Sequence, residues 1–115
     1  MLSLLLKFKN AEIKKIETEK VDIVIGRNPK CDIHIDNLGV SKQHARIVKQ
    51  DGQYVIEDLN STNGTFVNNK RVARAIINNN DEIQIGKHSL IVGLQAQKAM
   101  EADQNFGEKT MVLSQ

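Results

Sequence analysis

The strongest constraint on this fold is a succession of short runs in which apolar and polar residues alternate, each followed by a turn signal. In the run 21–25, for example, Val21, Ile23 and Ile25 fall on one face. This period of two is typical of a strand with one buried face. Comparable runs occupy 2–9, 12–17, 33–35, 44–50, 54–59, 65–68, 71–72, 75–77, 82–85 and 88–94. The pattern predicts an all-β protein, an antiparallel β-sandwich of two sheets with about 10 to 11 short strands.

Length and composition set the number of domains and the kind of core. The chain has 115 residues, enough for one domain with one core. Aromatic residues make up only 3% of it, so Val, Ile and Leu must fill that core, as suits a sheet protein. We expect residues 1–95 to form this domain. Residues 96–115 break the alternation, and we expect them to form a flexible C-terminal tail.

Charge, hydropathy and cysteine content argue against several classes of function. The net charge is +2, and the predicted strands carry no aromatic platforms, so a nucleic-acid partner is not indicated. The apolar start from Leu2 to Leu6 is too short to span a membrane and lacks the marks of a signal peptide, so no membrane partner is expected. Cys31 is the only cysteine, which fits a reducing compartment, and we expect a cytoplasmic location.

Two polar, loop-like segments carry most of the chemistry. The first runs from Gly26-Arg27 to the stretch 40–44, VSKQH, and the second is 60–64, NSTNG. They offer a guanidinium, an ammonium, hydroxyls and amides. The only carboxylates are Asp32 and Asp36, at the edges of the short run between the loop tips. This inventory suits a doubly charged, oxygen-rich ligand such as a phosphate ester.

Each residue of these loops also has an ordinary structural explanation. Arg27 and Lys42 can be solvated loop cations, and Ser41 can cap its own loop. Thr62 can hold its own turn, and Asn63-Gly64 fits a tight hairpin turn. The phosphate interpretation rests on the occurrence of all of them together.

Catalytic and metal-binding interpretations have less support. His44 follows Ser41 by three residues, but this spacing at a loop-to-strand junction gives no reason to expect a nucleophile and its base. His34 and His88 are distant in sequence, and Cys31 has no second cysteine to complete a ligand set. We expect a protein that is not an enzyme and that needs no metal and no cofactor.

Three motifs in order, Gly26-Arg27, Ser41-x-x-His44 and Thr62-Asn63-Gly64, resemble those of the forkhead-associated (FHA) domain family. The stretches GRNPKCDIHI and IEDLNSTNGTFVN and the late DEIQIG add to the likeness, which covers roughly residues 1–95. The resemblance implies an eleven-strand sandwich of two sheets. In this family the binding loops gather at one end and recognise phosphothreonine in a partner peptide.

The resemblance also implies a role for each ligand-facing residue. Arg27 would pair with the phosphate, and Ser41 would donate its hydroxyl to a phosphate oxygen. Thr62 and Lys42 occupy positions at which other members add phosphate contacts. Asn63 would fix the peptide backbone beside the phosphothreonine.

Other matched residues would support the loops rather than contact the ligand. These are Gly26, His44 and Gly64, with His44 bracing the loops by hydrogen bonds. One position departs from the family pattern, because a small amide is common where this chain has Lys42. A flexible cation there can strengthen the attraction for phosphate while loosening its geometry.

The predicted tail contains an isolated threonine, Thr110, with Leu113 three residues further on. Members of the family often discriminate at that third position. The chain from Gln95 to Thr110 can extend to at most about 50 Å, well beyond the radius of about 13 Å expected for a domain of this size. Phosphorylated Thr110 is therefore a candidate ligand for this domain, in cis or in trans.

We therefore predict a phosphothreonine-dependent protein–protein interaction module that acts as a signalling adaptor. Its expected partners are a phosphothreonine-containing protein or peptide and a Ser/Thr kinase. The alternative is a phosphorylation-independent interaction or self-assembly domain, which would use the same loops or a face of a sheet.

Overall fold

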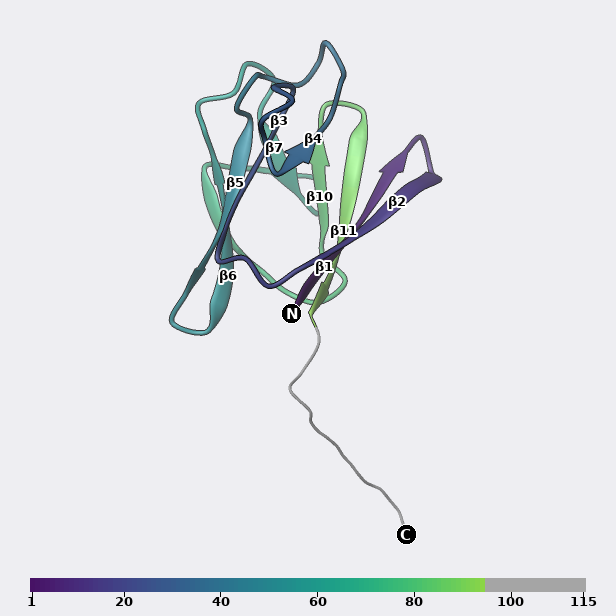
Figure 1. Ribbon diagram of the computed structural model, residues 1–115. Helices are drawn as coiled ribbons and strands as arrows, with labels where there is room; N and C mark the ends of the chain where they lie inside the picture. The colour runs from purple at the N-terminus through teal and green to yellow at the C-terminus, as the bar shows by residue number, and fades with distance from the viewer. Residues whose placement is uncertain (95–115) are drawn as a thin grey trace, which may run out of the picture.

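Eleven β-strands form the part of the chain that the computed structural model describes, residues 1–94, and this part contains no helix (Figure 1). The strands are β1 (Leu2–Phe8), β2 (Ala11–Thr18), β3 (Asp22–Gly26), β4 (Ile33–His34), β5 (Ala45–Gln50), β6 (Gln53–Asp58), β7 (Thr65–Val67), β8 (Lys70–Val72), β9 (Arg74–Ile77), β10 (Glu82–Ile85) and β11 (His88–Leu94). They build two sheets, and the predicted all-β sandwich is confirmed. The predicted tail lies outside the described residues.

The two sheets differ in size and in how their strands pair. The β1 sheet has six strands in the order β2-β1-β11-β10-β7-β8, and the β5 sheet has five in the order β4-β3-β5-β6-β9. Strands pair antiparallel in both sheets, as expected, with one exception: β3 and β4 run parallel, with Ile25 beside Ile33. Only two residues of each strand pair, at the end of β3, so the short segment 27–32 suffices to bring the chain back alongside that end.

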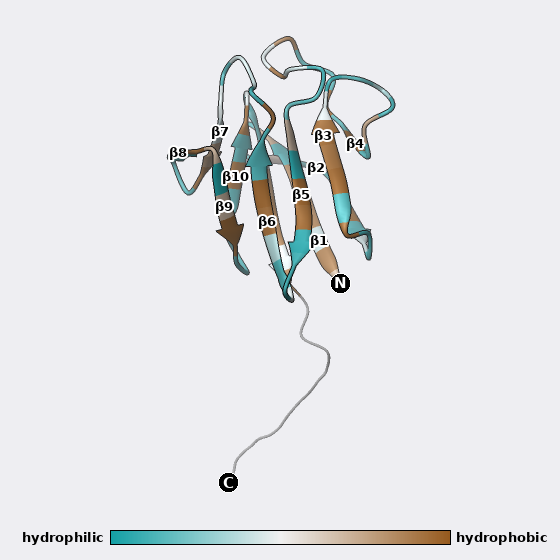
Figure 2. Cartoon of the chain, turned by 90° about the vertical axis from the view of Figure 1, so that its left-hand side faces the viewer, coloured by the Kyte–Doolittle hydropathy of each residue, from teal (hydrophilic) through white to brown (hydrophobic). Residues whose placement is uncertain are grey.

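Alternation along the strands places the apolar side chains between the sheets. In β1, Leu2, Leu4 and Leu6 are buried, and Leu4 lies opposite Val92 of β11. Burial of each such aliphatic side chain contributes about 1.5–3 kcal/mol. Figure 2 shows the apolar colour concentrated along β3, β5 and β6 and the polar colour on the connecting loops. The buried cluster comprises Leu2, Leu4, Leu6, Ile23, Ile25, Ile33, Ile35, Val40, Ala45, Ile47, Tyr54, Ile56, Val67, Ile77, Ile83, Ile85, Leu90 and Val92.

Residues with left-handed backbone make the tight turns. The β5–β6 hairpin turns at Asp51 (φ 52°) and Gly52 (φ 80°), between the predicted runs 44–50 and 54–59. Two other turns begin one residue earlier than the predicted runs imply. The β1–β2 turn uses Lys9 and Asn10, although the run 2–9 was expected to be strand, and the β7–β8 turn uses 68–69, although the run 65–68 was expected to be strand. In both cases asparagine adopts a conformation that most side chains avoid.

The long polar connections gather at one end of the sandwich, opposite the two ends of the described chain (Figures 1 and 2). This end receives the segments 27–32 and 35–44, the loop 59–64 and the β10–β11 turn at 86–87. At the other end, Leu2 pairs with Leu94. Ile35 and Val40 are buried in the core, so the longest of these connections is anchored at both sides of its exposed tip. None of residues 1–94 forms a helix long and apolar enough to cross a membrane.

Candidate functional site

Arg27 is held against the loop that contains Ser41. Its backbone N–H donates to the Ser41 carbonyl at 3.0 Å, and the next residue, Asn28, donates to the Lys42 carbonyl at 3.1 Å. The Arg27 side chain uses Nε to donate to the carbonyl of the buried Val40 at 3.0 Å. Within residues 1–94 the terminal guanidinium nitrogens make no hydrogen bond. The arrangement aims a fixed positive charge with free donors at the rim of the site.

Gly26 allows this close approach of the two segments. A Cβ at Gly26 would lie 2.2 Å from the backbone oxygen of Lys42, a separation that real Cβ atoms do not adopt. Any larger residue would therefore push apart the segments that carry Arg27 and Ser41. The structure thus gives a steric reason for glycine at this position.

Ser41 connects the first loop to the second. Its Oγ accepts a hydrogen bond from the backbone N–H of Thr62 at 3.1 Å. Because Oγ acts as the acceptor in this bond, the hydroxyl hydrogen stays free to be donated outward. The Thr62 side chain is exposed, and its hydroxyl makes no hydrogen bond within the described part of the chain. Two hydroxyls on neighbouring loops are therefore available to one anion.

His44 is completely buried beneath these loops and joins them from below. Its Nδ1 accepts from the Ser41 backbone N–H at 3.1 Å, so Nε2 is the donor, and it lies 2.8 Å from the Gly64 carbonyl oxygen. The His44 backbone makes two further bonds, to Ile25 and to Leu59. The imidazole satisfies polar groups of both loops, and its two ring nitrogens are used in doing so.

Asn63 forms a further bridge between the two loops. Its Nδ2 donates to the Gly39 carbonyl at 2.9 Å, and Oδ1 is left as an acceptor for a peptide N–H. Beside it lies a hollow of about 680 Å³ lined by 36–39, Asn63, Gly86 and Lys87. Leu38, at the tip of this wall, is 91% exposed, an unusual position for leucine.

A carboxylate that sequence reasoning missed shapes the loop 59–64. Asp58 accepts from the Ser61 hydroxyl, from the Ser61 backbone N–H at 3.1 Å and from Thr65 Oγ1 at 2.7 Å. Ser61 Oγ in turn accepts from the Gly64 N–H at 3.0 Å. Burial opposes ionisation of Asp58, but the hydrogen bonds from Ser61 and Thr65 hold its pKa below its usual range. The spacing D-x-x-S-x-x-G is the signal from which this support could have been found.

This network also decides an alternative that the sequence left open for Thr62. Ser61, not Thr62, holds the turn through its own hydroxyl, and Ser61 is buried. Asn60 (φ 58°) and Gly64 (φ 89°) supply the left-handed backbone at the two ends of the turn. Thr62 therefore stands at the exposed tip of a turn that other residues stabilise.

The structure brings the expected site residues to one rim. Backbone and side-chain hydrogen bonds link the segments of Arg27, Ser41 and Lys42, and further bonds link Ser41 to Thr62 and Asn63 to Gly39. Lys42 is exposed, and its side chain forms no ion pair within residues 1–94. Thr110, the expected modification site, lies outside the described residues.

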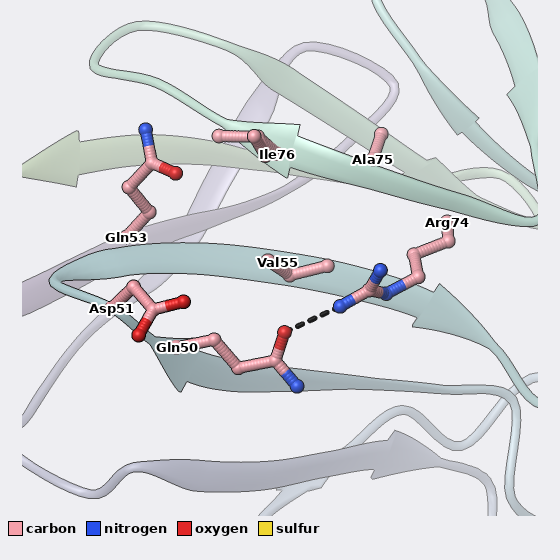
Figure 3. Close-up of a pocket in the computed structure, with 7 residues that line it drawn as sticks. All are labelled: Gln50, Asp51, Gln53, Val55, Arg74, Ala75 and Ile76. Carbon is pink, nitrogen blue, oxygen red and sulfur yellow. Dashed lines mark hydrogen bonds between the residues drawn. The ribbon is translucent and has the colours of Figure 1, made fainter.

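A second hollow lies on the outer face of the β5 sheet, away from the loops (Figure 3). Its floor is Val55 of β6, and Ile76 of β9 stands beside it, 48% exposed. The Arg74 guanidinium reaches across from β9 to hydrogen-bond Gln50 and pairs with Glu57 at 3.1 Å. Arg74, the cation of this hollow, is thus already paired with Glu57, whereas Arg27 has no ion-pair partner among residues 1–94.

Neither metal binding nor thiol chemistry finds support in the described residues. No three of their His, Cys, Asp or Glu side chains come together to hold a metal ion. Cys31 donates to the Lys42 carbonyl at 3.3 Å, and burial raises the pKa of its thiol. A raised pKa disfavours the reactive thiolate at neutral pH.

The described residues thus form an eleven-strand sandwich with a polar rim at one end, and comparison with known families identifies the family. The model of the FHA domain matches residues 23–86, more than half of the chain. The chain therefore belongs to the FHA domain family, as its motifs suggested.

The chain is similar to regulators of bacterial metabolism. It is 39% identical over 82 residues to the glycogen accumulation regulator GarA of Mycobacterium tuberculosis, covering 71% of this chain and 50% of that protein. It is 41% identical over 66 residues to the oxoglutarate dehydrogenase inhibitor of Corynebacterium diphtheriae, covering 57% of this chain and 46% of the relative. The chain thus spans about half the length of the curated relatives it matches.

Solved structures share the whole sandwich. One, from work on phosphothreonine-dependent FHA domain interactions, superposes with a TM-score of 0.75 at 28% identity and covers 83% of this chain and 97% of its own. Another is the FhaA FHA domain complexed with the intracellular domain of Rv3910, with a TM-score of 0.72 at 29% identity, covering 80% of this chain and 99% of its own. Mycobacterium tuberculosis EmbR, bound to a low-affinity phosphopeptide, gives 0.73 at 29% identity over 85% of this chain and 26% of its own.

Proposed function

We propose that this protein is a non-catalytic reader of phosphothreonine that binds a phosphorylated protein through the rim of Arg27, Ser41 and Thr62. The observation that carries the proposal is the set of unused donors there. The terminal nitrogens of Arg27 and the hydroxyl hydrogens of Ser41 and Thr62 have no acceptor within residues 1–94. Hydrogen bonds nevertheless hold the backbones of both loops in place. Lys42 adds a cation beside them, and the resemblance to phosphopeptide-bound FHA structures supports the same ligand.

The strength of this site follows from the chemistry of the ligand. Phosphothreonine carries a charge of about −1.5 to −2 and three strong acceptor oxygens. Each charge-assisted hydrogen bond contributes about 1.5–3 kcal/mol. Three or four such bonds, less the cost of ordering an extended peptide, give a dissociation constant in roughly the micromolar range. This affinity suits an adaptor that must release its partner when a phosphatase acts.

Calorimetry with matched peptides tests the proposal. We expect a phosphothreonine peptide to bind and its unphosphorylated form not to bind measurably. Arg27→Ala should weaken binding by about 100-fold or more, because it removes the fixed charge and at least one charge-assisted bond. Lys30→Ala is the matched control: it removes a cation from the same turn, which the site does not use, and should change affinity by about twofold at most.

The alternative function, phosphorylation-independent interaction or self-assembly, makes the opposite prediction. Equal binding of the phosphorylated and plain peptides, or unchanged binding by Arg27→Ala, would favour it. The outer face of the β5 sheet, with Val55 and Ile76 around the hollow of Figure 3, is the surface that such a partner would use. Its charges are paired with each other, so we give it second place.

We further propose that Thr110 regulates this site when it is phosphorylated. β11 carries the chain from the loop end at His88 to the far end at Leu94, about 20 Å away. The residues from Gln95 to Thr110 can span about 50 Å when extended, so a phosphate at Thr110 can return to the rim. Binding of the tail would then compete with binding of a partner.

A chain phosphorylated at Thr110 separates regulation in cis from regulation in trans. In cis, it should bind an external phosphothreonine peptide several-fold more weakly than the unmodified chain, and the loss should not depend on protein concentration. In trans, it should form dimers or larger assemblies in analytical ultracentrifugation, and Arg27→Ala should abolish them. Unchanged peptide affinity together with a monomeric phosphorylated chain would exclude both.

A further inference from the structure

Arg71, in the edge strand β8, lies against the corner of the site formed by Asn63 and Gly64. A Cβ at Gly64 would lie 2.7 Å from Arg71 Nε and 3.0 Å from Cζ, so the guanidinium group lies directly over the Gly64 backbone. Phe66 of β7 pairs with Arg71 in the sheet and points to the same outer face. The side chain thus extends from the sheet toward the loop 59–64 that carries Thr62 and Asn63.

The charge of Arg71 is not used by the described part of the chain. The structure describes four arginines, and three of them have acceptors: Arg27 donates to Val40, Arg46 to Asp22 at 2.6 Å, and Arg74 to Glu57 and Gln50. Arg71 forms neither an ion pair nor a hydrogen bond with any of residues 1–94, and it is exposed. A guanidinium that lies over the loop without an acceptor can supply two parallel donors to a carboxylate.

A second cation reaches the same corner. Lys87, in the β10–β11 turn, lines the hollow that also contains Asn63, and Asp36 is the one carboxylate among the lining residues of that hollow. Asn63 is the residue expected to hold the peptide backbone beside the phosphothreonine. Successive residues of an extended peptide advance by about 3.3 Å, so a side chain within a few residues of the phosphothreonine would come within reach of Arg71.

Resting on the proposed phosphothreonine function, we propose that Arg71 is a specificity-determining residue that binds an acidic side chain of the ligand on the Asn63 side of the phosphothreonine. The preferred ligand is then a phosphothreonine followed or preceded by Asp or Glu at one particular position. The phosphate contacts of Arg27 supply the modification dependence, and Arg71 supplies a choice among phosphorylated sequences.

A glutamate scan tests this assignment. A phosphothreonine peptide with alanine on both sides is compared with peptides that carry one glutamate at each of the four positions before and after the phosphothreonine. Wild type should bind one of them about 2- to 5-fold more tightly than the all-alanine peptide, the range expected for an arginine–carboxylate pair at a partly exposed interface. Arg71→Gln should lose this preference and still bind the all-alanine peptide with wild-type affinity. Lys70→Gln, its neighbour in β8, is the matched control and should keep the preference.

Charge reversal provides a second readout that a purely structural role would not produce. Arg71→Glu should prefer lysine over glutamate at the position that the scan identifies. The assignment is overturned if wild type binds phosphopeptides with no glutamate preference, or if Arg71→Gln keeps that preference. It is also overturned if Arg71→Gln weakens every phosphopeptide equally and lowers the melting temperature, since packing over Gly64 would then be its role. If wild type binds no phosphopeptide at all, the proposed function itself fails.

Discussion

At the scale of single residues, the site depends on close packing between the segments that form it. Gly26 and His44 make this packing possible. Gly26 has no side chain, so its segment can lie against the segment of Ser41, and His44 hydrogen-bonds to Ser41 and Gly64 from beneath the loops. Neither has a donor that faces the expected ligand. Substitutions at these positions should therefore affect the folded state first and binding as a consequence.

Gly26→Ala should destabilise the domain by about 2–3 kcal/mol, since its Cβ would overlap the Lys42 carbonyl and force a backbone shift. Chemical denaturation measures this loss. The same shift should move Arg27 relative to Ser41, so phosphopeptide affinity should fall even at temperatures at which the variant is fully folded. Wild-type stability in this variant would show that the two segments can separate without cost.

Asp58 should make stability depend on acid pH. Its pKa is lowered in the folded state, so its stabilising contribution is complete above the unfolded-state pKa of about 4 and is lost as the pH falls through the folded-state value. Denaturation of wild type at pH 7 and pH 3 should show that loss, and Asp58→Asn should show a smaller one. Asp36→Asn, which removes an exposed carboxylate from the neighbouring loop, should behave like wild type. Equal pH dependence in all three proteins would contradict the role given to Asp58.

The sequence predicted which residues would lie together at the rim and three of their supports, Gly26, His44 and Gly64, but it did not predict the support from Asp58 and Ser61. Arg27, Ser41 and Asn63 each have an ordinary explanation in a loop, and it was their occurrence together in ordered motifs that predicted the rim. Asp58 and Ser61 were missed because an acid and a serine three residues apart occur in many ordinary turns, and only the fold shows that Ser61 is buried and hydrogen-bonded to Asp58. Arg71 was missed for another reason: the sequence around a single arginine in a short strand does not indicate which loop its side chain will contact.

At the scale of elements, the loops expected to bind the ligand are distant from the hairpin at the other end of the same strands. The loops that form the rim and the β5–β6 hairpin lie at opposite ends of the same strands (Figure 2). β5 begins directly after His44 with the buried residues Ala45 and Ile47, so the loop end of this strand is anchored in the core, whereas its hairpin end is exposed. Changes at the hairpin should therefore alter stability without altering the site.

Gly52→Ala tests this separation. Gly52 has a φ of 80°, and a Cβ there would have no neighbour within 4 Å, so only the backbone conformation resists the change. We expect a loss of about 1–2 kcal/mol in the free energy of unfolding and unchanged phosphopeptide affinity. Gly52→Asn should lose less, because asparagine tolerates the left-handed region better. A large fall in affinity would show that the two ends are coupled.

The elements themselves were mostly predictable, and the exceptions have physical causes. Alternation located the strands because each has one buried face, as in β10, where Ile83 and Ile85 are buried between half-exposed neighbours. The parallel β3–β4 pair could not be foreseen, since a strand as short as Ile33–His34 carries no information about direction. The β1–β2 turn was misplaced by one residue because Lys9, a residue that seldom adopts a positive φ, shares the turn with Asn10.

At the scale of the whole molecule, the sandwich has the polar loops at one end and both ends of the described chain at the other. The free guanidinium donors of Arg27 lie at the loop end, whereas on the outer face of the β5 sheet Arg46 pairs with Asp22 and Arg74 pairs with Glu57. This asymmetry is the reason for placing the ligand at the rim. It also separates the proposed function from an alternative partner that binds the sheet face, because the two predict contacts on different parts of the molecule.

The most direct measurement is an NMR titration of the isotopically labelled protein with a phosphothreonine peptide and with its plain counterpart. We predict that the phosphorylated peptide alone will shift the amide signals of Arg27, Ser41, Thr62 and Asn63, and that Arg27→Ala will abolish these shifts. Shifts confined to Gln50, Val55 and Ile76 on the outer face of the β5 sheet, or equal shifts with both peptides, would contradict the account.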